Sequence, residues 1–374
     1  MPEAALSLQP GHATPEGTAA YAAGHAAGAA AGHFRQAQGL TLSSIGLGSY
    51  LGEPDVRDDD RYREATEEAV RLGCNFIDTA INYRFQRSER ALGRAIAALV
   101  GGGAVRREEI VVATKGGYLP FDGEPPGDPS RYFHDTFVRP GVARPDDLVA
   151  GCHCMTPAYL ENQLEASRRN LGLACLDVYY VHNPEQQLDE IGRDAFLSRL
   201  RDAFERLERL ADAGWLRFYG TATWNGYRAP PDAPGHLDLE EMVAAARQVA
   251  GERHRFRFVQ APLNLAMPEA LAAPTQRLNG RPLSLLEAAA GLGVSVVASA
   301  SILQGRLSRG LPADLVRRLP GLTTDAQRSL QFVRSAPGLA SALVGMKTME
   351  HVRENLRVAA VPPLSASGFR EAFS

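Results

Sequence analysis

The chain has 374 residues, of which 45% are hydrophobic and 22% are charged, and its formal net charge is -3. This balance is ordinary for a globular protein, offers no basic surface for nucleic acid, and contains no apolar run near the roughly 20 residues of a membrane span. The N-terminus carries no leader-like block, and the 4 cysteines are too irregularly spaced for a disulfide framework, so we expect a cytoplasmic protein.

Residues 1–37 are rich in Ala, Gly and His and have little helical or strand periodicity. We expect a flexible leader, with a weak helix at most within residues 18–32. The histidines of this stretch are spread too evenly to predict a metal site.

From residue 38 to residue 360 the sequence alternates between short apolar runs and amphipathic stretches. The expected strands lie near residues 45, 75, 111, 178, 220, 258, 296 and 342, and the expected helices are 61–72, 86–100, 156–171, 196–210, 237–250, 284–292, 324–334 and 349–358. Strand–helix alternation predicts a parallel sheet covered by helices, and eight repeats favour a closed (β/α)8 TIM barrel. No Gly-x-Gly-x-x-Gly follows a strand, which argues against an open dinucleotide-binding sheet. We expect one barrel followed by a short polar tail, 361–374.

The segment 116–155 interrupts this alternation with Gly, Pro, Asp and aromatic residues. A loop of this length is usually functional or a lid, so its aromatic residues are expected either to form a substrate wall or to pack the lid itself. Cys152-His153-Cys154, with His134 nearby, lacks the paired C-x2-C spacing of structural zinc sites. We therefore predict no metal site there, but a loop that crosses the barrel mouth.

Chemically active side chains cluster where the expected strands end. In a TIM barrel the active site lies at the carboxyl ends of the strands. The residues at these ends are Asp78 with Tyr83 on its loop, Lys115, His182-Asn183, Thr223-Trp224, Gln260 and Lys347. The chain uses arginine for nearly all of its 40 basic residues, and its only two lysines, Lys115 and Lys347, both fall at strand ends.

These residue types favour proton transfer. An isolated D-x4-Y would be a capped turn beside a wall residue. With Lys115 close by, however, the ammonium can lower the pKa of the Tyr83 phenol, and Asp78 can keep Lys115 charged. His182 can orient a substrate oxygen while Tyr83 donates a proton to a carbonyl that is being reduced. None of these groups carries electrons, so the reaction would need a hydride donor.

Four motifs in order resemble the aldo-keto reductases over residues 39–356. They are N-F-I-D-T-A-I-N-Y followed by S-E-R-A-L-G, then V-A-T-K-G, D-V-Y-Y-V-H-N-P and V-G-M-K-T-M-E-H-V-R-E-N-L. The resemblance implies a catalytic tetrad of Asp78, Tyr83, Lys115 and His182. It also implies an extended NADPH across the barrel mouth, bound without a glycine-rich fingerprint.

When the cofactor-binding positions of the family are carried over one by one, the resemblance implies which residues surround the cofactor. Its expected neighbours are Gly48, Ser49 and Tyr50 at the border, Thr223 and Gln260 at the nicotinamide, Asn183 at the carboxamide, and Gly345, Lys347, Thr348, Glu354 and Asn355 at the adenosine. Lys347 suits a 2'-phosphate, which favours NADP(H) over NAD(H). Ser299 replaces an aromatic residue that stacks on the nicotinamide in many members, and His351 stands where arginine or glutamine is common.

The function expected from the resemblance is reduction of small aldehydes or ketones with NADPH, or the reverse oxidation of an alcohol or sugar. The alternative is a catalytically slow, NADP(H)-binding regulatory subunit on the same barrel. A metal-dependent hydrolase would need several His and Asp ligands at strand ends, where His182 is the only histidine. The C-terminal tail is too short for the substrate loop of some members, so the 116–155 segment is expected to take that role.

Overall fold

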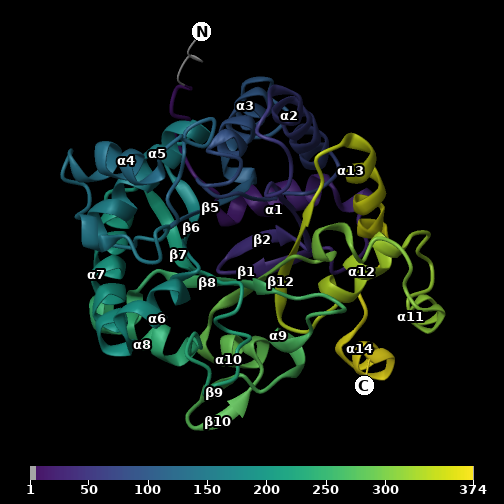
Figure 1. Ribbon diagram of the computed structural model, residues 1–374. Helices are drawn as coiled ribbons and strands as arrows, with labels where there is room; N and C mark the ends of the chain where they lie inside the picture. The colour runs from purple at the N-terminus through teal and green to yellow at the C-terminus, as the bar shows by residue number, and fades with distance from the viewer. Residues whose placement is uncertain (1–5, 374) are drawn as a thin grey trace.

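The computed structural model describes residues 6–373 and contains a closed barrel of eight parallel strands (Figure 1). Each strand pairs with the next one along the barrel, and the last pairs with the first. The strands are β3 (Ile45–Gly48), β4 (Phe76–Asp78), β5 (Val111–Gly116), β6 (Leu176–His182), β7 (Leu216–Ala222), β8 (Phe256–Pro262), β11 (Ser295–Ser299) and β12 (Leu339–Gly345). The predicted TIM barrel is confirmed, with all eight strands where the sequence indicated them.

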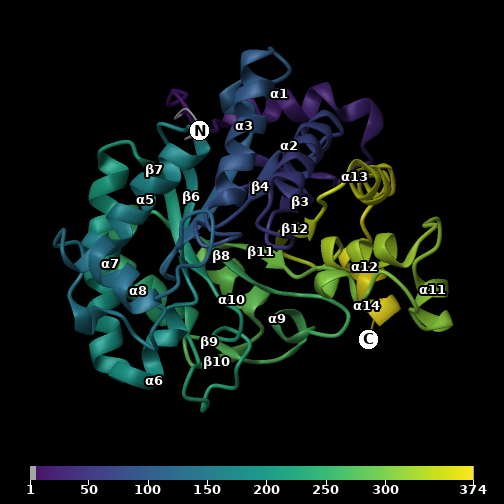
Figure 2. The same ribbon diagram turned by 45° about the horizontal axis from the view of Figure 1, so that its top comes forward.

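Helices surround the strands on the outside (Figures 1 and 2). The longer ones are α2 (Val56–Arg71), α3 (Arg87–Gly101), α5 (Pro157–Leu171), α7 (Arg193–Asp212), α8 (Leu239–Ala250), α10 (Leu285–Leu292), α12 (Asp325–Arg334) and α13 (Met349–Leu356). Shorter ones are α4 (Pro129–Phe133), α6 (Leu188–Ile191), α9 (Glu269–Ala272) and α11 (Ala313–Arg318), and β9 (Gln276–Leu278) pairs with β10 (Arg281–Leu283) as a hairpin. Within residues 6–373 no helix combines the length and apolarity that crossing a membrane requires.

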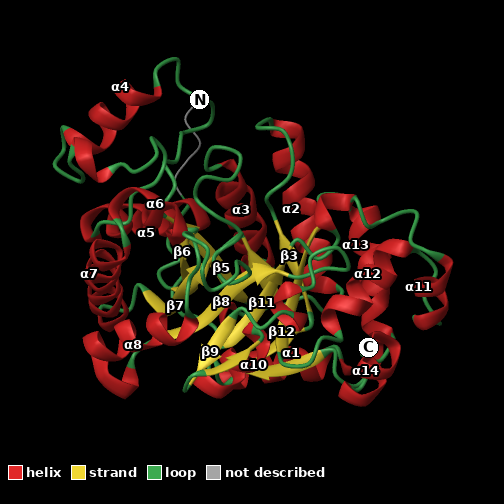
Figure 3. Ribbon diagram, turned by 60° about the horizontal axis from the view of Figure 1, so that its bottom comes forward, coloured by secondary structure: helices red, strands yellow, loops and turns green. Residues whose placement is uncertain are grey.

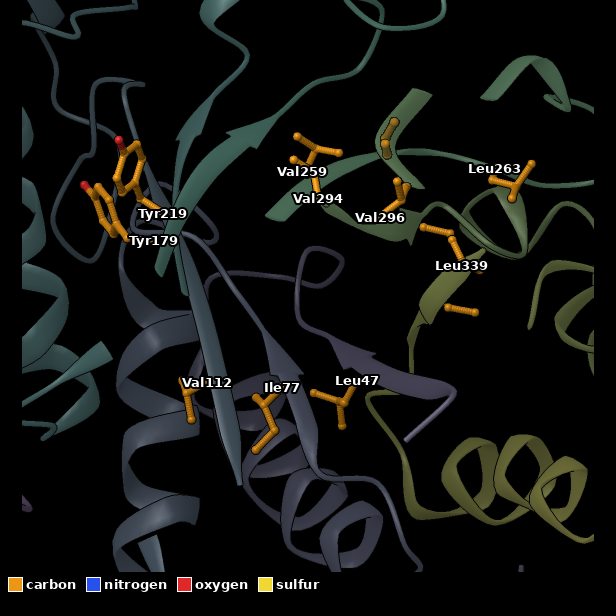
Figure 4. Close-up of a cluster of buried hydrophobic side chains, with 14 of the residues drawn as sticks. Leu47, Ile77, Val112, Tyr179, Tyr219, Val259, Leu263, Val294, Val296 and Leu339 are labelled. Carbon is orange, nitrogen blue, oxygen red and sulfur yellow. The ribbon is translucent and has the colours of Figure 1, made fainter. Parts of the chain in front are cut away.

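Strand periodicity decides which residues reach the active site. One set of side chains points outward and packs under the helices, among them Leu47, Ile77 and Val112 (Figure 4). The alternate set fills the barrel interior, among them Phe76, Val111, Val178 and Phe258. Because side chains alternate with a period of two, positions two or four residues further on point inward as well. These positions are Asp78, Lys115, His182 and Gln260.

The N-terminal segment is packed against the barrel, so the expectation of a flexible leader is wrong for residues 6–37. Helix α1 (Pro15–Gly24) buries Tyr21, whose hydroxyl donates to the carbonyl of Val70 in α2. Strands β1 (Phe34–Ala37) and β2 (Leu40–Ser43) form an antiparallel hairpin. Leu40 and Leu42 of this hairpin join the interior cluster and close the amino-terminal end of the barrel.

The C-terminal tail also differs from the expectation of a polar extension. It forms helix α14 (Ala366–Phe373), which packs two phenylalanines against α12. The ring centroid of Phe332 lies 5.4 Å from that of Phe369 and 4.8 Å from that of Phe373. The tail therefore covers the outside of the barrel and adds apolar contacts to it.

Burial of His33 predicts a pH-dependent stability. Its Nε2 donates to the carbonyl of Gly73 at 3.1 Å, its Nδ1 lies 3.1 Å from the Ser44 hydroxyl, and burial lowers its pKa to about 4. As pH falls below about 6.5 the unfolded chain binds a proton first, so this histidine lowers the free energy of unfolding by about 1–2 kcal/mol between pH 7 and pH 5. We expect His33→Asn to be less stable at pH 7 and to lose less on acidification, as measured by urea denaturation at both pH values. An equal loss in the variant would contradict this assignment.

Candidate active site

A buried ion pair forms the floor of the barrel mouth. The ammonium of Lys115 donates to Asp78 Oδ1 at 2.5 Å and to the carbonyl of Thr79 at 2.8 Å. Gln260 donates from Nε2 to the other carboxylate oxygen of Asp78 at 2.8 Å. Burial alone would lower the pKa of Lys115, but the attraction of Asp78 outweighs it and raises that pKa. The lysine therefore stays charged, as the sequence analysis expected.

Tyr83 lies directly over this charge. The Lys115 ammonium is 4.8 Å from the centroid of the phenol ring, whose other neighbours are the rings of Tyr50 and His182 at 5.0 Å and 5.8 Å. Burial raises the pKa of Tyr83, and Lys115 opposes that shift without overcoming it. The expected lowering of the pKa by Lys115 is thus only one contribution, and the phenol stays protonated, which suits a proton donor.

His182 completes the group from the end of β6. Burial and the nearby charge of Lys115 lower the pKa of His182 well below its ordinary value, so the imidazole is neutral at physiological pH. A neutral imidazole can donate one hydrogen bond to a substrate oxygen without competing with Tyr83 as the acid. The structure thus brings together all four members of the expected tetrad.

The loop that carries Tyr83 is held by an arginine. Arg84, Phe85 and Gln86 all have positive φ, at 49°, 56° and 68°, a conformation that costs non-glycine residues about 1 kcal/mol each. The Arg84 guanidinium donates to the carbonyl of Glu53 at 2.8 Å and to Asp59 Oδ1 at 2.5 Å. These contacts tie the turn after Tyr83 to the start of α2.

A cleft of about 530 Å³ runs from this group towards α13. Of the expected site residues it is lined by Gly48, Ser49, Tyr50, Asp78, Tyr83, Gln260, Gly345, Lys347, Glu354 and Asn355. Ser299 and His351 line it as well, and the sequence analysis did not anticipate the contributions of Tyr62, Ile302, Arg309 and Thr324. Residues from β3, β8, β11 and β12 therefore share one elongated space.

Three expected cofactor residues lie elsewhere in the described structure and do not line this cleft. Asn183 donates to the hydroxyl of Tyr118 at 2.9 Å, and the ring of Tyr118 lies 5.0 Å from that of His182. Thr223 is buried at the end of β7, and Thr348 caps α13 by accepting from the amide of His351. For Thr348 the structure gives a helix-capping role that the motif did not indicate.

Lys347 has a partner that the sequence analysis missed. Its ammonium donates to Asp58 Oδ2 at 2.8 Å, and the Asp58 side chain is only 1% exposed. Burial would raise the pKa of Asp58, but Lys347, the amide of Glu53 and Arg61 together hold it well below its ordinary value. Acidic residues at the start of a helix, such as those at 58–60, ordinarily favour the helix dipole, so their position in the sequence does not indicate this ion pair. Figure 2 shows why Asp58 reaches Lys347, since α2 lies beside α13.

The 116–155 segment is a lid with its own small core. Its two ends pair with each other, because Leu119 donates its amide to the carbonyl of Cys152 at 2.7 Å and Cys154 donates to that of Gly117 at 2.8 Å. Between these ends α4 and a π-helix, His134–Val138, pack Phe133 and Phe137 on Tyr159 of α5. Figure 3 shows α4 projecting above α5. Most of the aromatic residues of this segment thus pack the lid, and Tyr118 reaches His182, with 5.0 Å between the ring centroids.

The Cys-His-Cys sequence serves the packing of this lid. All four cysteines of the chain are free thiols, and in residues 6–373 no three His, Cys, Asp or Glu side chains are grouped so as to hold a metal ion. His153 is fully buried and hydrogen-bonded to protein groups.

Comparisons with known proteins agree with this geometry. The sequence model of the Aldo/keto reductase family matches residues 44–230, which is half of the chain. A relative in Arabidopsis thaliana, named "Probable voltage-gated potassium channel subunit beta", is 23% identical over 340 residues, covering 87% of this chain and 90% of its own. An aldo-keto reductase family 1 member C23-like protein of Equus caballus is 27% identical over 196 residues, so the chain spans about half of its length (49%).

Solved structures share the fold. An aldo/keto reductase from Klebsiella pneumoniae, crystallised with NADP and acetate, has a TM-score of 0.58 and 21% sequence identity, with 90% of this chain and 92% of that chain covered. With the family match over half of the sequence and the barrel in place, the chain belongs to the aldo/keto reductase family.

Proposed function

We propose that this chain is an NADPH-dependent oxidoreductase that reduces aldehyde or ketone groups of small molecules to alcohols, or catalyses the reverse reaction. The observation that carries the proposal is the buried Asp78–Lys115 pair beneath Tyr83, at the inner end of an elongated cleft. Family membership supports the class of reaction, and the substrate class follows from the chemistry of the site.

The side chains of the site divide the proton chemistry among them. Neutral His182 donates a hydrogen bond to the substrate carbonyl oxygen and directs it towards the phenol. Tyr83 then gives its proton to that oxygen, and the Lys115 ammonium stabilises the phenolate that remains. Asp78 keeps Lys115 charged by accepting a hydrogen bond from its ammonium, and the carbonyl of Thr79 accepts a second one, which helps to hold the ammonium in place. The bound nicotinamide would supply the hydride.

The cleft fits an extended dinucleotide. It connects Tyr83 with Lys347 and Asn355, so one ligand can reach the proton donor and a cation at the same time. Tyr50, which is 55% exposed, borders the entrance at the Tyr83 end. The NADP bound to the related Klebsiella pneumoniae enzyme supports the choice of NADP(H) here.

A spectrophotometric screen tests the reductase proposal. Oxidation of NADPH and NADH would be followed by absorbance in the presence of aldehydes, ketones and sugars, and reduction of NADP in the presence of the corresponding alcohols. We expect turnover with NADPH for at least one class of carbonyl compound. A chain that binds neither dinucleotide would contradict the proposal.

A second candidate is a slow, NADP(H)-binding regulatory subunit. It is favoured by the coverage of the relative named as a potassium channel subunit beta, which matches 87% of this chain. The two candidates agree on cofactor binding and differ in rate. Tight binding of NADPH without turnover over the whole carbonyl panel would favour the regulatory subunit.

Lys347→Ala is expected to weaken NADPH binding by about 10-fold or more and NADH binding by less than about 3-fold. The reason is that loss of a charge-assisted contact to a phosphate costs about 1.5–3 kcal/mol, and only NADPH carries the 2'-phosphate. Dissociation constants from quenching of protein fluorescence provide the measurement. Equal losses for the two dinucleotides would contradict the 2'-phosphate role.

Asp58→Asn is the matched control for Lys347. Asp58 holds the same ammonium at 2.8 Å, so its charge competes with a bound phosphate. Removing that charge is expected to strengthen NADPH binding and to leave NADH binding unchanged. Weaker NADPH binding in this variant would instead mean that Asp58 acts by holding Lys347 in place.

A further inference from the structure

His153, from the lid, makes a set of contacts that the proposed function does not use. Its Nε2 lies 2.7 Å from the carbonyl oxygen of His182, and its Nδ1 lies 2.8 Å from Nε2 of Gln187. The side chain is fully buried. Its ring stands edge-on to Tyr118, with 5.3 Å between centroids, and Tyr118 in turn stands edge-on to His182. A buried polar residue thus contacts the catalytic histidine on its backbone and, through Tyr118, on its ring.

Arg199 of α7 fixes the direction of the hydrogen bonds that link Gln187, His153 and the carbonyl of His182. A guanidinium can only donate, and Arg199 Nη1 lies 2.6 Å from Oε1 of Gln187. The amide nitrogen of Gln187 therefore faces His153 Nδ1, which must accept. The proton of the neutral imidazole is then on Nε2, which donates to the carbonyl of His182. Burial lowers the pKa of His153 to about 4, so the ring stays neutral at physiological pH.

The backbone around this contact is shaped for close approach. Gly117 has a φ of +134°, and a Cβ atom there would lie 2.7 Å from His153 Nε2 and 3.2 Å from the His182 carbonyl oxygen. Asn183, the residue after His182, has a φ of 44° and ends β6 with a left-handed turn. The carbonyl of His182 thus sits where strand pairing gives way to the turn, and His153 is its side-chain partner.

We propose that His153 is a positioning residue for catalysis: its Nε2–H fixes the carbonyl of His182 and, with Tyr118 against the ring, directs the imidazole of His182 towards Tyr83. This inference rests on the proposed function and extends it. It gives the lid a role in orienting the catalytic histidine. Arg199 and Gln187 act one step further out, by fixing which nitrogen of His153 carries the proton.

The kinetic test compares two substitutions at His153. His153→Leu removes the donor and is expected to lower kcat about 10- to 100-fold, with the dissociation constant of NADPH unchanged. His153→Gln retains an amide N–H at a similar reach and is expected to restore kcat to within about 3-fold of the wild type. His236→Leu, which removes another buried histidine far along the chain, is the control and should leave kcat unchanged. A His153→Leu enzyme with wild-type kcat, or a His153→Gln enzyme as slow as His153→Leu, would overturn the proposal.

A spectroscopic test needs no turnover. In protein labelled with ¹⁵N-histidine, the ring resonances missing from His153→Gln identify His153, and we expect them to show the Nε2–H tautomer. The ring resonances of His182 should shift in His153→Leu. An Nδ1–H tautomer, or His182 resonances that do not move, would overturn the positioning role even if His153→Leu were too unstable for kinetics. A wild-type chain without carbonyl reductase activity would contradict the proposed function alone, since these resonances are read independently.

Discussion

Tyr83→Phe is expected to lower kcat for carbonyl reduction by about 10²–10⁴-fold, the usual contribution of a positioned general acid. The substitution removes only the hydroxyl, so the ring keeps its contacts with Tyr50 and His182, and the Asp78–Lys115 pair stays intact. NADPH binding should therefore change by less than about 2-fold. Steady-state kinetics and fluorescence titration measure the two quantities separately.

Tyr219→Phe is the matched control for Tyr83→Phe. Tyr219 is also buried, but it points outward from β7 and packs against Phe204 of α7. Its loss of a hydroxyl should leave kcat close to that of the wild type. If Tyr83→Phe retained most of the activity, the proton would have to come from another group, and Tyr83 would not be the acid.

Asp177→Ala is expected to lower the free energy of unfolding by about 3–5 kcal/mol, the cost of breaking a buried ion pair on one side. The carboxylate, 1% exposed, accepts from the Arg107 guanidinium at 2.8 Å. It also accepts from the amides of Ala13 at 2.6 Å and Val112 at 2.8 Å. The variant leaves a buried guanidinium without its carboxylate partner and two amides without their acceptor, and it releases one anchor of the N-terminal segment. Chemical denaturation gives the change in midpoint and slope.

An exposed pair provides the comparison for this stability effect. Glu165 and Arg169 lie 2.5 Å apart on α5, with both side chains largely in solvent. Glu165→Ala should change the free energy of unfolding by less than about 1 kcal/mol. A similarly small effect for Asp177→Ala would mean that the surrounding structure accommodates Arg107 without its partner.

The sequence predicted those parts of the fold that repeat with a short period. Each barrel strand is an apolar run followed by a helix with an apolar stripe, and the inward positions lead directly to Asp78, Lys115 and His182. The scarcity of lysine was a second signal, since Lys115 lies in the expected tetrad and Lys347 lines the cleft. The first signal can be read within a few residues of chain and the second from the composition, and neither needs contacts between distant residues.

The features that were missed depend on contacts between distant parts of the chain. Helix α1 is rich in alanine and lacks a clear apolar stripe, so its packing becomes evident only in the structure, where Gly17, Thr18 and Tyr21 are buried. Asp58 and Lys347 are 289 positions apart, and no local pattern connects them. The sequence analysis weighed His153 only as a metal ligand and predicted no metal site, whereas its proposed positioning role depends on Gln187 and Arg199, which come from other elements.

The pairing of the two ends of the lid allows the length and composition of the lid to change during evolution. Gly117 bonds to Cys154 and Leu119 to Cys152, so the chain leaves the barrel and returns to it at almost the same place. A segment of different length or composition could span these two anchor points without moving β5 or β6. The part of the lid between residues 119 and 152 can therefore be replaced, provided that Gly117, Tyr118 and His153 remain at its two ends. Changes in sequence can then accumulate between residues 119 and 152 while Asp78, Lys115 and His182 keep their positions.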